Sequence, residues 1–247
     1  MIADNTAVII LAAGKGRRMH SSKAKVLHPL AGRPLISWVL QTAAKLVDRN
    51  IVVVVGNQAD QVKKCVSESA DVMFAYQEAQ RGTGHAVQCA LPVLDAGIEN
   101  VLILCGDVPL ISEKTLTGLL SLHAQADNAV TLLTVQLDNP DGYGRVITNT
   151  GGRVERIVEE ADATAAEKEI STINSGIYCV RRSFLDNAVH RLRADNAQAE
   201  IYLTDIIEIA CRAAEPVGMM VAERPTELLG VNTPEDLIWV ESLLSIT

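Results

Sequence analysis

Apolar residues occur in short runs along the first half of the chain, separated by segments with the spacing of a helix. Five runs have the length of a strand, at 6–12, 50–56, 72–77, 100–107 and 129–137. VVVV and VLILC within them do not alternate with polar residues, which is typical of parallel strands buried on both faces. Helices are predicted over 34–46, 84–94 and 112–126. This alternation predicts a doubly wound, mostly parallel α/β sheet.

The pattern changes after residue 137. GRVITNTGGRVERIVEEA reads as two strands joined through Gly151-Gly152, a hairpin signature. The remaining elements are predicted as strands at 170–180 and 217–223, helices at 183–192 and 203–214, and a last helix from Thr233-Pro234. Because no linker divides the chain, we expect one domain over 1–247. It has a nucleotide-binding-like half (1–137) and a β-rich half (138–247) that covers the carboxyl edge of the sheet.

Composition excludes several classes of protein. A 48% hydrophobic content is enough for a substantial core, and a net charge of −8 disfavours a basic face for nucleic acid. We see no apolar run of about 18 residues, and Asp4 stands where a signal peptide is basic. The five cysteines form no CxxC pair, which fits buried thiols in a reducing compartment. We therefore expect a cytoplasmic protein without a nucleic-acid or membrane partner and without zinc.

A cluster of cations follows the first predicted strand. The turn AGKG (13–16) leads into Arg17 and Arg18, and Lys25 follows. Glycines let backbone N–H groups approach phosphate, and ligands of open α/β sheets bind at the carboxyl ends of strands. The dinucleotide fingerprint fails because its third glycine would fall on Met19, and the P-loop spacing is absent. The reading left open is a glycine turn with solvated cations.

Two further strand exits carry candidate groups. Asp107 ends the run at 100–107 and could hold a divalent cation, or it could simply form a turn or cap a helix. The Gly-rich turn QEAQRGTGHA (77–86) opens a helix, and the Gln77 amide has a donor and an acceptor for the imide edge of a base. The alternative for this second turn is a plain helix N-terminus.

Taken in order, the motifs LAAGKGRRM, KVLHPLAGRPL, GTGHA, GDVPLI, GYGRV, IVEEADA, INSGIY, YLTDII and GVNTPEDL resemble the sugar-nucleotide pyrophosphorylases. Within that family the resemblance is greatest to the uridyltransferases that use N-acetylglucosamine 1-phosphate, and it covers about residues 6–240. It implies a Rossmann-like nucleotide-diphospho-sugar transferase fold. It also implies a reaction in which UTP and a sugar 1-phosphate give a nucleotide sugar and pyrophosphate, with Mg²⁺ as cofactor.

The resemblance also implies a role for each matching residue. Arg18 and Lys25 match catalytic cations, and the metal ligands match Asp107 and Asn232. The nucleotide-binding positions match Leu11, Ala12, Ala13, Gly14, Gly16, Gln77, Gly82 and Thr83. The sugar-contacting positions match Gly106, Gly144, Glu159, Asn174 and Asn232.

Three positions depart from the family pattern. Ala24 replaces a common proline, which implies a less rigid loop, and Arg17 replaces a small residue. Cys105 replaces the usual tyrosine before Gly-Asp, so the identity of the sugar stays open. Glucose 1-phosphate or another base are therefore alternatives.

Two readings from other classes are less favoured. Loss of the catalytic groups would indicate an inactive regulatory module, but Arg18, Lys25, Asp107 and Asn232 are all present. A dehydrogenase lacks support because the dinucleotide fingerprint fails. Bifunctional family members continue into a β-helix of hexapeptide repeats that carries an acetyltransferase and most of the trimer contacts. This chain ends at WVESLLSIT, so we expect no acetyl transfer, no obligate protein partner, and a monomer or weak dimer.

Overall fold

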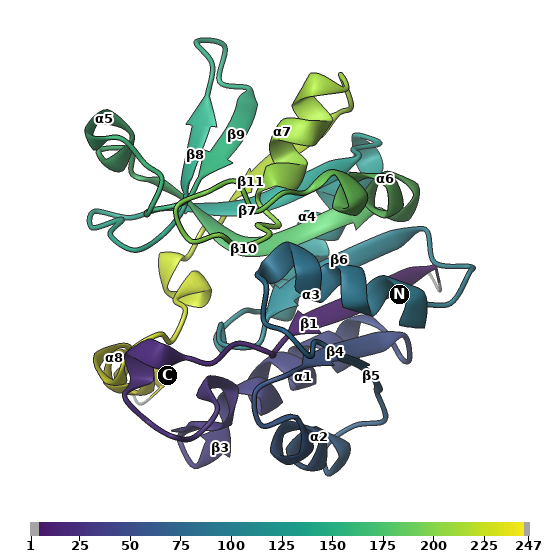
Figure 1. Ribbon diagram of the computed structural model, residues 1–247, viewed down its shortest axis with the longest axis vertical. Helices are drawn as coiled ribbons and strands as arrows, with labels where there is room; N and C mark the ends of the chain where they lie inside the picture. Colours follow the sequence, from purple (N-terminus) through teal and green to yellow (C-terminus); the bar gives the residue numbers. More distant parts are fainter. Residues whose placement is uncertain (1–4, 245–247) are drawn as a thin grey trace.

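A mostly parallel sheet runs through the described part of the chain, residues 5–244 of a computed structural model (Figure 1). The ends of the expected domain, 1–4 and 245–247, lie outside the described residues. The main strand order is β11-β7-β10-β6-β1-β4-β5. These strands are β1 (Thr6–Leu11), β4 (Ile51–Val55), β5 (Met73–Tyr76), β6 (Asn100–Cys105), β7 (Val130–Gln136), β10 (Thr172–Arg181) and β11 (Val217–Val221). The doubly wound α/β prediction is confirmed.

Helices cover both faces of the sheet. One face packs against α1 (Leu35–Leu46), α2 (Ala59–Ser67) and α4 (Glu113–Gln125), and the other against α3 (Thr83–Ala90), α6 (Arg182–Ala188) and α7 (Asp205–Arg212). Within β1, Val8 and Ile10 join the first core, whereas Ala7 and Ile9 join the second. Successive side chains of a strand point to opposite faces, so a strand covered on both sides needs apolar residues at every position. The unbroken apolar runs have this cause.

The sequence pattern predicted strand β10 but not its position in the sheet. It lies between β6 and β7 and is antiparallel to both, with a register shift between Asn174 and Tyr178. The hairpin of β8 (Arg145–Thr148) and β9 (Val154–Val158) branches from it, and Figure 1 shows this hairpin standing away from the main sheet. The second half of the chain thus adds strands to the sheet of the first half.

The remaining elements are short or terminal. The predicted helix over 84–94 divides at Pro92, because α3 ends at Ala90 and a 3₁₀ turn follows over Leu91–Val93. Smaller elements are β2 (Pro29–Leu30), β3 (Arg33–Pro34), α5 (Ala165–Lys168) and the C-terminal α8 (Pro234–Leu244). No helix among the described residues has the length and apolar content needed to cross a membrane.

Helix α8 lies beside the segment that follows β1, drawn in purple in Figure 1. Met19 is buried there against Val231 and Val240, so the two ends of the described chain share a small core. This contact brings the GVNTPEDL motif to the carboxyl edge of the parallel strands.

Candidate functional site

The loop after β1 is hydrogen-bonded to β4 and the turn that follows it, and it passes close to Lys25. Ala12 donates its N–H to Val54 O at 3.0 Å, and Ala13 O accepts from Asn57 N at 3.1 Å. Gly16 has φ +59°, and a Cβ added there would lie 2.6 Å from the Cβ of Lys25. Position 16 therefore needs glycine for its conformation and for the close approach of the lysine.

Lys25, Asp107 and Asn232 meet at the carboxyl edge of the sheet. The Lys25 ammonium forms an ion pair with the Asp107 carboxylate and donates to Asn232 Oδ1 at 3.0 Å, although Asn232 is 207 residues away in sequence. The side chains of Lys25 and Asp107 are only 18% and 16% exposed. A carboxylate and an amide oxygen thus converge on one cation in a partly desolvated place, where electrostatic attraction is stronger than in water.

The position of Asn232 follows from the start of α8. Val231 donates its N–H to Asp107 O at 2.9 Å, which ties this segment to the exit of β6. The Asp236 carboxylate accepts from the N–H groups of Asn232 and Thr233 at 2.8 and 2.9 Å. An acidic side chain within the first turn of a helix satisfies N–H groups that have no helical partner. Capping of α8 therefore also holds Asn232 in the site.

The oxygen atoms of this cluster fit a hard divalent cation. Carboxylate and amide oxygens are the protein ligands that Mg²⁺ prefers, and the ion usually takes its remaining ligands from water and phosphate. Across residues 5–244 no group of three or more His, Cys, Asp or Glu side chains could hold a metal. Asp107 Oδ and Asn232 Oδ1 could therefore supply two oxygen ligands to such an ion.

Arg18 extends from the same loop toward the β7–β8 connection. It is exposed, and its Nη1 lies 3.7 Å from the position of a Cβ added to Gly142. The next residue, Tyr143, is half-buried, and its hydroxyl accepts a backbone hydrogen bond from Gly230. Arg18 thus faces a loop that is itself joined to the segment before Asn232.

Gln58 holds the loop where the family has proline. Its Oε1 accepts from Ala24 N at 2.9 Å, and its Nε2 bonds to Ser22 O. Proline has no N–H and would lose the first of these bonds. The two hydrogen bonds of Gln58 thus oppose the loss of rigidity expected from Ala24. No sequence motif indicated them.

The two adjacent carboxylates of the VEEADA motif have different surroundings. Thr204 donates to Glu159 at 3.1 Å, yet burial raises the pKa of Glu159 above its usual value. Glu160 instead forms ion pairs with the fully buried Arg145 at 2.8 Å and with Lys168 at 3.0 Å. The hydrogen bond from Lys168 lowers the pKa of Glu160. Glu160 is thus a structural anion, and Glu159 is the carboxylate left for a ligand.

Gly144 lies against the Glu159 carboxylate, and Asn174 is hydrogen-bonded to Gly144. A Cβ on Gly144 would lie 3.2 Å from Glu159 Oε2, and Gly144 O accepts from Asn174 N at 2.8 Å. Asn174 Oδ1 accepts from the Tyr178 hydroxyl at 2.9 Å. Asn174 Oδ1 also accepts from Gly176 N at 3.1 Å, and because a backbone N–H can only donate, this bond fixes the amide and leaves Nδ2 as the group that Asn174 can offer to a ligand.

Cys105 is directed toward β10. Its Sγ lies 3.5 Å from Gly176 O, and burial, together with the nearby Asp107, raises the pKa of the thiol to about 12. The thiol is therefore neutral and donates to the chain itself. It offers a sugar neither the ring nor the hydroxyl of the family tyrosine.

Gln77 and the Gly82-Thr83 turn form the third part of the candidate site. Gly82 has φ +110°, and a Cβ there would lie 2.5 Å from Ile201 O, so the turn has no room for a side chain. The Thr83 hydroxyl accepts from Leu203 N at 3.0 Å, which fastens the turn to the YLTDII segment. Gln77 is only 3% exposed and donates from Nε2 to Gly82 O at 2.9 Å.

The structure thus places the predicted residues in three groups. The first lies at the exits of β1 and β6 with Lys25 and consists of Leu11, Ala12, Ala13, Gly14, Gly16, Arg18, Gly106, Asp107 and Asn232. The others are Gln77 with Gly82 and Thr83, and Gly144 with Glu159 and Asn174. The sequence did not predict that Gln58, Tyr143 and Glu160 help to position the candidate site. Tyr143 lies in the GYGRV motif and Glu160 in the IVEEADA motif.

The chain matches a known domain family over more than half its length. The model of the MobA-like NTP transferase domain matches residues 8–147. A protein of Trichlorobacter lovleyi named bifunctional protein GlmU is 49% identical over 92% of this chain and 49% of its own length. The GlmU of Geotalea uraniireducens is 47% identical over 98% of this chain and 53% of its own length. For Desulfotalea psychrophila GlmU the values are 44%, 96% and 70%. The chain spans about half the length of the first two relatives.

Proposed function

The chain belongs to the MobA-like NTP transferase family and is a homologue of the GlmU proteins, and from this premise we propose its substrates. We propose that it joins UTP and N-acetylglucosamine 1-phosphate to form UDP-N-acetylglucosamine and pyrophosphate, with Mg²⁺ as cofactor. The observation that carries the proposal is the meeting of Lys25 with Asp107 and Asn232 beside the β1 loop.

The reaction explains why cations gather in an acidic protein. A sugar phosphate is largely dianionic near neutral pH, so its oxygen attacks the α-phosphorus of UTP without a general base. A new P–O bond forms, the bond from the α-phosphorus to the bridging oxygen breaks, and pyrophosphate leaves. Catalysis of such transfers depends mainly on positioning and on neutralising charge. Lys25 would bind the reacting phosphates, and Arg18 would bind the departing pyrophosphate.

The metal would be held by Asp107 and Asn232. Bound Mg²⁺ neutralises phosphate charge and orients the phosphates for in-line displacement. Lys25 already occupies the space between these two side chains, so it has to move toward the phosphates when the site is filled.

The sugar would lie against Glu159, Asn174 and Gly144. Glu159 offers acceptor oxygens to sugar hydroxyls, and Asn174 Nδ2 offers a donor. Gly144 leaves the carboxylate accessible, because a side chain there would lie against Glu159. One observation favours a second candidate, glucose 1-phosphate. Cys105 donates to Gly176 and adds no polar contact for a 2-acetamido group.

A substrate panel tests the proposal. Pyrophosphate release is measured with UTP, CTP, ATP and GTP against N-acetylglucosamine, glucosamine and glucose 1-phosphates, with and without Mg²⁺. We expect the highest kcat/KM for UTP with N-acetylglucosamine 1-phosphate and no turnover after chelation of the metal. A higher value for glucose 1-phosphate would favour the second candidate. A preference for another base, or full turnover without a divalent cation, would contradict the proposal.

A further inference from the structure

The hydrogen bonds around Gln77 determine which way its amide faces. Nε2 lies 2.9 Å from Gly82 O and 3.1 Å from Nδ1 of His85. A carbonyl oxygen only accepts, so the atom of the Gln77 amide that faces Gly82 O has to be the NH₂ group. Its second hydrogen then points to His85, and Nδ1 of the imidazole accepts it.

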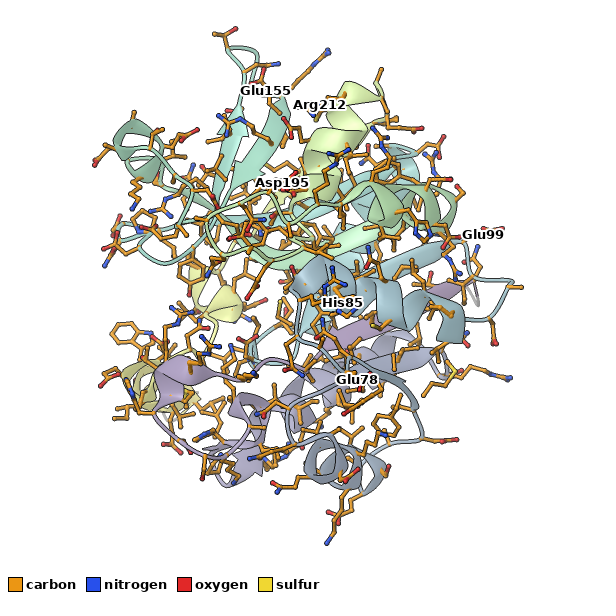
Figure 2. All side chains as sticks on the ribbon, in the orientation of Figure 1. Glu78, His85, Glu99, Glu155, Asp195 and Arg212 are labelled. Carbon is orange, nitrogen blue, oxygen red and sulfur yellow. The ribbon has the colours of Figure 1, made fainter. Side chains whose placement is uncertain are left out.

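This arrangement fixes the tautomer of His85. Because Nδ1 accepts, Nε2 carries the ring hydrogen, and Nε2 lies 3.8 Å from Cys89 Sγ one helical turn further along α3. Burial raises the pKa of the Cys89 thiol, so its sulfur stays neutral beside the ring. Figure 2 shows His85 on α3 near the centre of the view, above Glu78, the neighbour of Gln77. The ring is thus supported on both sides.

The remaining hydrogen-bonding atom of the Gln77 amide is its oxygen, Oε1. Both hydrogens of Gln77 Nε2 are used by Gly82 and His85, and within residues 5–244 no group is seen to donate to its Oε1. If the amide rotated by half a turn, Oε1 would face the oxygen of Gly82 and the lone pair of Nδ1. Two repulsive contacts therefore oppose the rotated state. The sequence indicated that the Gln77 amide could offer a base one donor and one acceptor. In the structure only the acceptor, Oε1, is left for the base.

We propose that His85 is a positioning residue that selects the base of the nucleotide, because it holds Gln77 Oε1 in place to accept from a ring N–H. Uracil has such an N–H at N3, whereas N3 of cytosine is an acceptor and would meet Oε1 lone pair to lone pair. A site with a fixed polar group rejects an analogue that leaves this group unpaired. The inference rests on the proposed function for the identity of the nucleotide.

The test compares two substitutions of His85. His85→Phe keeps a ring but removes one of the two contacts that oppose rotation, and only the contact with Gly82 O remains, so the amide turns its NH₂ toward cytosine more readily. The ratio of kcat/KM for UTP to that for CTP should fall about tenfold or more. His85→Asn returns a carbonyl oxygen near the position of Nδ1 and should restore most of the ratio. His190→Phe, the same change at an exposed histidine, should leave it unaltered.

An equal loss of kcat/KM for both nucleotides in His85→Phe would mean a merely structural role and would overturn the inference. Should the phenylalanine variant not fold, the wild-type protein still provides a test. Long-range ¹H–¹⁵N correlation spectra report the tautomer, and we expect His85 with its hydrogen on Nε2. A hydrogen on Nδ1 would contradict the inference whatever the substrate is. Failure of the proposed function is seen separately, as a wild-type enzyme that does not use UTP.

Discussion

Asp107→Asn is expected to abolish most turnover while the protein stays folded. The amide keeps the size of the side chain but removes the anion that pairs with Lys25. The proposed metal site loses its charged ligand at the same time. Removing one contact that stabilises the transferring phosphates typically lowers the rate by about 10²–10³, or roughly 3–4 kcal/mol. The measurement is kcat from pyrophosphate release at saturating Mg²⁺, with circular dichroism to monitor folding.

The control for this variant is Asp95→Asn, which changes an exposed carboxylate near the start of β6, at the opposite end of that strand. It should retain wild-type turnover. If Asp107→Asn kept near-full activity that still depended on Mg²⁺, the assignment of Asp107 to the metal would be wrong.

Lys25→Met is expected to change two quantities in opposite directions. Turnover should fall by about 10²–10³, because the phosphates lose a partly buried cation. Binding of Mn²⁺, a spectroscopic substitute for Mg²⁺, to the protein without nucleotide should become several-fold tighter. The ammonium lies between Asp107 and Asn232 and therefore competes with a metal for the same two oxygens. Free Mn²⁺ is measured by electron paramagnetic resonance, and turnover by pyrophosphate release.

Lys114→Met provides the matched control. Lys114 pairs with Glu223 at 3.1 Å, but both side chains are at least 80% exposed, and such pairs contribute little. Neither turnover nor Mn²⁺ affinity should change in this variant. A Lys25→Met protein that bound Mn²⁺ more weakly than wild type would show that the lysine supports the metal site and does not compete with it.

The sequence predicted the central parallel strands β1, β4 and β6 well because these strands are buried on both faces. The run IVVVV in β4 is short and consists of β-branched residues, which favours a buried strand over a buried helix, and the predicted bounds differ from those of β4 by one residue. The position of β10 was beyond prediction, since pairing with β6 and β7 depends on contacts between distant segments. Local patterns identify a strand but not its neighbours.

The candidate site shows the same division. Glycine turns and cations marked the exit of β1 from the residues alone, whereas the pairing of Asp107 with Asn232 was implied only by family resemblance. The contact between Val231 and Asp107, which brings them together, has no local sequence signal. Gln58 and His85 act through side-chain hydrogen bonds to other residues, so their contributions needed coordinates.

The most direct test of the proposed phosphate site at the β1 loop is a crystal structure of the protein with UTP and Mg²⁺, without the sugar phosphate. The triphosphate should lie along the loop at Gly14–Gly16, the ion should contact Asp107 and Asn232, and Lys25 should have moved from Asp107 to a phosphate oxygen. A nucleotide whose phosphates bind away from this loop, with Lys25 still paired to Asp107, would contradict the proposed site and the mechanism built on it.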